Sequence, residues 1–104
     1  MSKEDFYSLI ENEIIPDCIA ILKTKGEAYT SDNDRLGGLK NIAAKLDNTP
    51  EKQWMSYFVK HFDAVTSYIK GNYSDSEKIE GRIVDMINYL FILYAVIIDK
   101  KNNE

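Results

Sequence analysis

The sequence predicts an all-α protein, a four-helix bundle formed by one domain over residues 1–104. Apolar residues recur every three or four positions in four segments, which is the period of a helix that turns one face to a core. No segment alternates polar and apolar residues with the period of two that marks a half-buried strand. The two strongest helical segments, 50–70 and 76–99, are joined by a short connection, so we expect them to pack as antiparallel neighbours.

The first helix is expected to begin near Phe6 and to continue past Leu22, because apolar residues repeat there at helical spacing. Pro16 lies inside this pattern and has no backbone N–H, so it should kink the helix or start a second segment. The polar segment 27–35 follows. It is long for a connection between helices, and loops of this kind tend to carry function.

The second and third helices have recognisable ends. A short helix is expected over residues 36–46, with Asn33 or Asp34 as its N-cap. The third helix should begin at Thr49-Pro50, since a threonine hydroxyl can accept a hydrogen bond from a free amide and proline suits the first helical position. It should end at Gly71, because glycine readily adopts the left-handed conformation found at helix ends.

The C-terminal helix is expected to begin at residue 76, because Ser74 and Glu77 have the spacing of a capping box. The tail 100–104 should be exposed. The segment 86–98 of this helix is apolar except for Asn88, but it is shorter than the ~18 residues that span a bilayer. We therefore interpret it as a buried helix and expect no membrane contact. A bundle of this size can cover such a helix only partly, so we predict a homo-oligomer, most simply a dimer, with its interface on this helix.

Composition excludes several classes of function. The chain of 104 residues has room for one compact core. Its net charge of -4 argues against a nucleic-acid polymer as partner, because such binding depends on basic residues that displace counterions. The single cysteine, Cys18, cannot form an internal disulfide, and residues 1–5 are charged rather than signal-like, so we expect a cytoplasmic location. No glycine-rich phosphate loop, serine elbow or zinc-binding spacing is present in the sequence.

Asp85 and Asn88 are polar residues three apart in an otherwise apolar helix, where an unpaired buried polar group costs about 1–3 kcal/mol. One interpretation is structural: Asn88 specifies helix register or dimer pairing, and Asp85 pairs with Arg82 or with a basic residue of the third helix. The other interpretation places both side chains on the wall of a polar pocket.

His61 lies on the flank of the apolar stripe of the third helix, next to Lys60. A single histidine is a poor metal site, and in such a position it is most often a hydrogen-bonded core residue. The functional alternative is that Lys60 and His61 meet Asp85 and Asn88 from the neighbouring helix and Arg35 from the end of the polar loop. Together these residues could bind phosphate and recognise a base.

Five short motifs follow one another between Leu22 and Asp99: Lys25-Gly-Glu-Ala-Tyr29, Asp34-Arg35-Leu36, Thr49-Pro50, Lys60-His61 and Asp85-Met-Ile-Asn88-Tyr89. Their order and spacing resemble those in a small phage and prophage family, the nucleotide modification associated domain 1 family. That family is similar to the all-α nucleoside-triphosphate pyrophosphohydrolases of MazG type, oligomeric helical proteins that bind a Mg²⁺-nucleotide between helices. The resemblance therefore implies a MazG-like fold, a bacterial host cell and a small nucleotide ligand.

The resemblance also implies which residues contact that ligand. Arg35 and Lys60 would meet phosphate, His61 would donate or accept a hydrogen bond, and Asp85 with Asn88 would contact base, sugar or a metal. Asp85 is the residue expected to hold Mg²⁺, and no catalytic residue is assigned. The complete set of expected ligand contacts is Lys25, Tyr29, Arg35, Lys60, His61, Asp85 and Asn88.

The chain departs from these families in two places. Gly38-Leu39 stands where family members tend to have Asn-Phe. The pyrophosphohydrolases use a Glu-x-x-Glu pair and a Glu-x-x-Asp pair, whereas this chain has Glu13-x-x-x-Asp17 and Asp85-x-x-Asn88. An amide in place of a carboxylate removes charge that a divalent ion needs.

We therefore expect a phage or prophage protein that binds a nucleotide, and we leave open whether it keeps weak Mg²⁺-dependent pyrophosphohydrolase activity. Two alternatives stay open. One is a counter-defence sponge that sequesters a nucleotide signal without turnover. The other is a structural helical interaction protein.

Overall fold

The structure is a computed structural model that describes residues 1–29 and 34–104, with the backbone alone for residues 27–29. Within this part of the chain every regular element is helical and there is no strand, so the prediction of an all-α protein is confirmed. The elements are α1 (Lys3–Leu9), the π-helical segment η1 (Ile10–Ile14), α2 (Ile15–Tyr29), α3 (Gly37–Lys45), α4 (Pro50–Ile69) and α5 (Ile79–Asn102).

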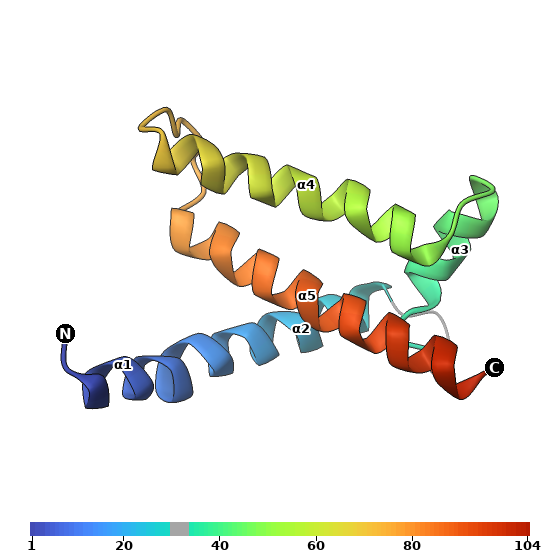
Figure 1. Ribbon diagram of the computed structural model, residues 1–104, viewed down its shortest axis with the longest axis horizontal. Helices are drawn as coiled ribbons and strands as arrows, with labels where there is room; N and C mark the ends of the chain where they lie inside the picture. Colours follow the sequence, from blue (N-terminus) through green and yellow to red (C-terminus); the bar gives the residue numbers. More distant parts are fainter. Residues whose placement is uncertain (30–33) are drawn as a thin grey trace.

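Helix α5 is the central element of the fold. It packs against α4 on one side and against α2 on the other, and α3 packs against α4. Figure 1 shows α4 and α5 side by side and antiparallel, as the short connection predicted, with α1, η1 and α2 forming one long rod across α5. Four helices therefore surround the middle of the molecule, where the candidate site lies.

The N-terminal rod changes its winding just before Pro16. The π-helical segment ends at Ile14, and α2 begins at Ile15, so a second α-helical segment starts beside the proline, as one of the two predicted outcomes, within a continuous rod (Figure 1). Proline cannot donate to the carbonyl one turn earlier, and the π segment lies in the turn where this hydrogen bond is missing. Helix α2 then continues to Tyr29, which corrects the prediction that the polar loop begins at residue 27. Glutamate and alanine, the residues at 27 and 28, are good helix formers.

The predicted ends of α4 are confirmed. The Thr49 hydroxyl accepts a hydrogen bond from the Lys52 amide at 3.2 Å, and Pro50 is the first helical residue. Gly71 follows the helix with a φ of 81°, the left-handed conformation that glycine tolerates best. At the start of α3, the Asp34 carboxylate accepts a hydrogen bond from the Leu36 amide at 3.0 Å. Asn33, the other predicted cap, lies outside the described residues.

The predicted start of the C-terminal helix is wrong by three residues. Helix α5 begins at Ile79, and the capping box expected at residues 74–77 does not form. Instead the Glu77 amide donates to Asp75 at 3.1 Å, and the Arg82 guanidinium binds both carboxylates, Asp75 directly and Glu77 at 3.2 Å. These ion pairs hold residues 74–77 as a turn outside the helix. The tail is exposed as expected, although α5 continues to Asn102.

Few side chains are buried in the single chain. The buried apolar residues are Cys18, Ala43, Trp54 and Val96. The interpretation of α5 as a buried helix is therefore wrong for most of its surface, because only Asn88 and Val96 are buried on it. At least two fifths of each of six large apolar side chains on α5 is exposed: Ile83, Leu90, Phe91, Tyr94, Ile97 and Ile98.

Helix α5 also has the length and apolar composition of a membrane-spanning helix. The sequence prediction counted only its uninterrupted apolar run, whereas an 18-residue stretch with at most two charged residues meets this requirement. The finding concerns only the length and composition of the helix, and a long apolar helix that forms an oligomer interface has the same properties.

Candidate functional site

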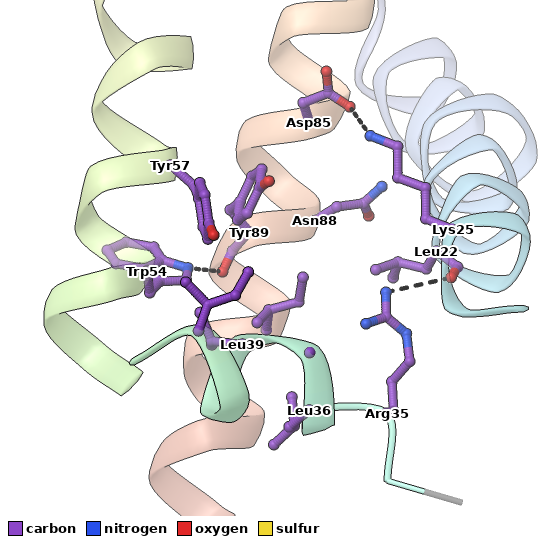
Figure 2. Close-up of a pocket in the computed structure, with 13 residues that line it drawn as sticks. Leu22, Lys25, Arg35, Leu36, Leu39, Trp54, Tyr57, Asp85, Asn88 and Tyr89 are labelled. Atoms are coloured by element: carbon purple, nitrogen blue, oxygen red, sulfur yellow. Dashed lines mark hydrogen bonds and ion pairs between the residues drawn. The ribbon is translucent and has the colours of Figure 1, made fainter. Parts of the chain in front are cut away.

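A cavity of about 360 Å³ lies between α2, α3, α4 and α5. Its volume falls within the range of about 300–1,000 Å³ that is typical of small-molecule sites. Figure 2 shows the side chains that line it: Leu22, Lys25, Arg35, Leu36, Gly38, Leu39, Ile42, Trp54, Tyr57, Asp85, Asn88, Tyr89 and Ile92.

The contribution of α5 follows from helical spacing. Three residues of α5 lie three, four and seven positions after Asp85, which places all four on one face of the helix: Asn88, Tyr89 and Ile92. This face meets α2 on one side and α4 on the other. The polar part of the face therefore lies where three helices converge.

Aromatic side chains form the α4 side of the cavity. Trp54 is almost fully buried, and its indole N–H donates to the Tyr89 carbonyl oxygen at 2.5 Å. Trp54 also stacks on Phe58, with ring centroids 4.8 Å apart. The rings of Tyr57 and Tyr89 lie 6.2 Å apart at the same wall (Figure 2). These contacts give the cavity an aromatic wall of fixed position.

Asn88 is the most unusual residue of the site. It is 5% exposed, and both its amide nitrogen and its amide oxygen are buried without a hydrogen-bond partner among the described residues. In Figure 2 its side chain points from α5 toward the α2 side of the cavity. Leaving a buried polar group unpaired costs about 1–3 kcal/mol. Within the described part of one chain, Asn88 therefore makes no hydrogen bond that would set helix register, and the alternative of dimer pairing stays a prediction.

The charged residues lie on the α2 side. The Lys25 ammonium is 3.5 Å from the Asp85 carboxylate, so the cationic partner of Asp85 comes from α2 and not from α4. The Arg35 guanidinium donates to the Leu22 carbonyl at 3.5 Å (Figure 2). It lies against Gly26, where an added Cβ would come within 2.7 Å of the Arg35 Nε. Among the described lining residues, two cations and one carboxylate leave a net positive charge.

Lys40 holds the segment that carries Arg35. Its ammonium lies 3.0 Å from Asp34, directly before Arg35, and 2.7 Å from Asp99 near the end of α5. The hydrogen bonds from Asp99 and Asp34 raise the pKa of Lys40, and the hydrogen bond from Lys40 lowers the pKa of Asp34. These ion pairs tie the start of α3 to the central helix and so place Arg35 at the cavity.

His61 lies behind Asp85 and does not line the cavity. Its Nδ1 is 3.2 Å from the Arg82 guanidinium and 3.7 Å from the Asp85 carboxylate. A guanidinium only donates, so Nδ1 accepts and the neutral ring carries its proton on Nε2. Burial lowers the pKa of His61; Asp85 opposes this shift, and the cations Arg82, Lys60 and Lys25 add to it. His61 therefore fits the interpretation of a hydrogen-bonded core residue.

The remaining predicted contacts have different outcomes. Lys60 is exposed on α4 and does not line the cavity. The side chain of Tyr29 lies outside the described residues. The structure thus brings together four of the seven expected ligand contacts: Lys25, Arg35, Asp85 and Asn88.

The expected contacts include neither the aromatic wall nor the Lys40 ion pairs, and two further features of the site were also missed. The first is the close approach of Arg35 to Gly26, which depends on how the chain returns to α2 and leaves no local pattern. The second is Ile92, whose spacing of four from Asn88 could have placed it on the same face.

The residues of the cavity do not fit Mg²⁺. This small ion prefers several oxygen ligands, commonly including one or two carboxylates. Among the described residues that line the cavity, Asp85 is the only one with a carboxylate, and it already faces Lys25. Nowhere in residues 1–29 and 34–104 do three or more histidine, cysteine, aspartate or glutamate side chains come together where they could hold a metal ion. Cys18 is fully buried, and burial raises its pKa, so its thiol is neutral.

Comparisons of the chain with protein-family models, with curated proteins and with solved structures find no match. The function is therefore inferred from the chemistry of the cavity.

Proposed function

We propose that the protein binds a small phosphorylated nucleotide in the cavity between α2 and α5 and does not hydrolyse it. Asn88 carries the proposal. Its buried amide offers one donor and one acceptor side by side, and both lack a partner among the described residues. A nucleobase presents donors and acceptors along one planar edge, and asparagine can pair with such an edge through two hydrogen bonds.

The cations on the α2 side suit the phosphate. The guanidinium of Arg35 matches the geometry of phosphate oxygens and stays charged at all relevant pH values. Lys25 supplies a second positive charge at the half-exposed side of the cavity. A bound phosphate would share Lys25 with Asp85, and the net positive lining would be balanced by the ligand.

The aromatic wall suits the base. The rings of Trp54, Tyr57 and Tyr89 lie across the cavity from the cations, so that a base against this wall leaves its phosphate on the α2 side. Stacking on an aromatic side chain is worth roughly 1–3 kcal/mol per base. Asp85, next to Asn88 on the same face, is placed to accept a hydrogen bond from a base or a sugar.

The lack of turnover follows from the donor set. Hydrolysis by a metal-activated water needs carboxylates that hold the ion, and the described part of the lining offers one. The resemblance to the nucleotide modification associated domain 1 family and to MazG-type proteins supports a nucleotide ligand between helices. It also supports a cytoplasmic role in a bacterial host, where a nucleotide signal could be sequestered.

Thermal shift measurements test the proposal. The full chain is heated with a panel of mononucleotides and cyclic nucleotides, with the matching nucleosides and inorganic phosphate as controls, each with and without Mg²⁺. A nucleotide at 100 times its dissociation constant should stabilise the protein by about 2.7 kcal/mol. Nucleosides should stabilise it less, because they lack the phosphate that Lys25 and Arg35 would bind.

Two results would contradict the proposal. If no compound in the panel shifts the transition, the cavity is not a nucleotide site. If the bound nucleotide is recovered as a monophosphate and pyrophosphate after incubation with Mg²⁺, the protein is an enzyme and the claim of binding without turnover is wrong.

A further inference from the structure

Helices α4 and α5 each carry a second apolar stripe. In both stripes the spacing alternates between four and three residues, the repeat of helices that pack in coiled coils. None of the ten residues is charged, and eight of them are between 42% and 77% exposed. We call the two stripes the outer seams: Met55, Val59, Phe62, Thr66 and Ile69 on α4, and Ile83, Ile87, Leu90, Tyr94 and Ile97 on α5.

The outer seams lie on the side of the molecule away from the cavity. Successive helical residues turn by about 100°, so Tyr94 lies on the opposite side of α5 from Asp85. On α4, Trp54 and His61 face α5, and the seam lies about 100° around the helix axis from them in one direction. Tyr57, which lines the cavity, lies around the axis in the other direction. The seam and the cavity are therefore on different sides of α4. Because α4 and α5 are antiparallel neighbours, the two seams form one continuous face.

The single chain exposes more surface than a folded monomer of its mass usually does. Its accessible surface is 7711 Å², whereas a folded monomer of 12.0 kDa exposes about 6,000 Å². The excess is therefore roughly 1,700 Å² per chain, about the area that one subunit of an obligate dimer buries. The radius of gyration of 15.7 Å, against about 13 Å for a compact domain of this length, points to the same openness.

We infer that the outer seams pack against the outer seams of a second copy of this chain. A twofold axis would place each α4–α5 hairpin against its copy and form an intermolecular four-helix bundle. The face is self-complementary in chemistry, because each copy presents the same uncharged apolar surface. Phe62 and Tyr94, near the middle of their seams and 53% and 71% exposed, would be covered most fully.

A lipid surface is the other occupant that α5 could suit. A helix inserted into a bilayer would carry Arg82 and Asp85 with it, and charged side chains are costly within hydrocarbon. Both residues are fixed in ion pairs away from the seam, Asp85 with Lys25 on the opposite side of α5 and Arg82, about 100° around the helix from the seam, with Asp75 and Glu77. Insertion of α5 alone into a bilayer would also leave the apolar seam of α4 uncovered. These observations favour a second copy.

Sedimentation velocity of the full chain over a wide range of concentrations tests the inference. The wild-type protein should sediment with twice the mass of 12.0 kDa. The double variant Phe62→Lys and Tyr94→Lys should sediment as a monomer with an unchanged helical circular dichroism spectrum, because both residues are exposed in the single chain. Leu46→Lys is the matched control: Leu46 is 64% exposed directly after α3, outside both seams, and the variant should leave the dimer intact.

Three results would overturn the inference. One is a wild-type monomer at all concentrations. Another is a folded double variant that is still dimeric, since the interface would then lie elsewhere. The third is wild-type monomer that floats with vesicles of phosphatidylcholine and phosphatidylglycerol, which would assign the face to lipid. If the double variant does not fold, hydroxyl-radical footprinting of the wild type decides: Tyr94 should be modified several times more slowly than Tyr7, and equal rates would contradict the inference.

Discussion

Replacing Asn88 with leucine should stabilise the ligand-free protein and abolish nucleotide binding. The asparagine side chain is 5% exposed, and both polar atoms lack hydrogen-bond partners in the described part of the chain. Leucine has a similar size and no polar atoms. It therefore removes the cost of an unpaired amide and adds apolar contacts with the leucines and isoleucines of the cavity, among them Leu22 and Ile92.

The expected gain follows from the cost of the unpaired group. A buried polar group without a partner costs about 1–3 kcal/mol, so Asn88→Leu should raise the free energy of unfolding by about that amount. For a domain of about 100 residues, each kcal/mol shifts the melting temperature by about 4–8 °C. The melting temperature should therefore rise by at least about 4 °C. The variant should show no further shift with any nucleotide.

Urea denaturation and calorimetric titration measure the two effects on the same preparations. Asn41→Leu is the matched control, because Asn41 is exposed on α3, where surface changes usually stay within about 0.5 kcal/mol. If Asn88→Leu lowers the stability of the ligand-free protein, the amide has a structural partner and the reasoning is wrong. If the variant still binds nucleotide with wild-type affinity, the ligand lies elsewhere.

Three further predictions concern the charged and titratable groups. Lys25→Gln should weaken nucleotide binding at least tenfold in calorimetric titration, because Asp85 would then face the phosphate without its cation; the exposed Lys60→Gln should change affinity less than twofold. Gly26→Ala should displace Arg35, whose Nε would lie 2.7 Å from the new Cβ, and so weaken binding, while thermal denaturation shows a helix stabilised by up to about 1 kcal/mol. The pKa of His61 is lowered below 6.5 by burial, so the unfolded chain takes up its proton more readily and stability should be lost as the pH falls below 6.5. Urea denaturation at pH 7.5 and 5.5 should show this loss in the wild type and not in His61→Gln, since the chain has one histidine. Equal losses in both proteins would assign the effect to other groups.

The helix ends show which parts of the fold local sequence determines. Thr49 and Gly71 end α4 through contacts with residues at most a few positions away, so their roles could be predicted. The capping box at residues 74–77 failed because Arg82, one turn into α5, binds Asp75 and Glu77 more effectively than the helix start does. A side chain that reaches back across a turn is outside the pattern by which a capping box is recognised.

The site was predictable where one helix contains the signal. Asp85 and Asn88 interrupt an apolar segment, and both line the cavity. Lys60 and His61 were less predictable, because adjacent residues on a helix point about 100° apart and periodicity does not give the rotation of α4 about its axis. The structure buries His61 behind Asp85 and leaves Lys60 exposed. The approach of α2 to α5, which brings Lys25 to Asp85, is a long-range contact without a local signature.

Helix α5 would serve two separate purposes, and this leads to a test of both proposals together. Asn88 faces the cavity, whereas Tyr94 belongs to the outer seam, and six residues of helix separate them by about 9 Å along the axis and about 120° around it. Residues this far apart with no shared partner usually contribute additively within about 0.5 kcal/mol. Asn88→Leu should therefore stabilise the protein by the same amount in the wild type and in a Tyr94→Lys background, measured by urea denaturation at one protein concentration. A coupling energy above about 1 kcal/mol would show that the cavity and the seam respond to each other, and nucleotide binding would then regulate self-association.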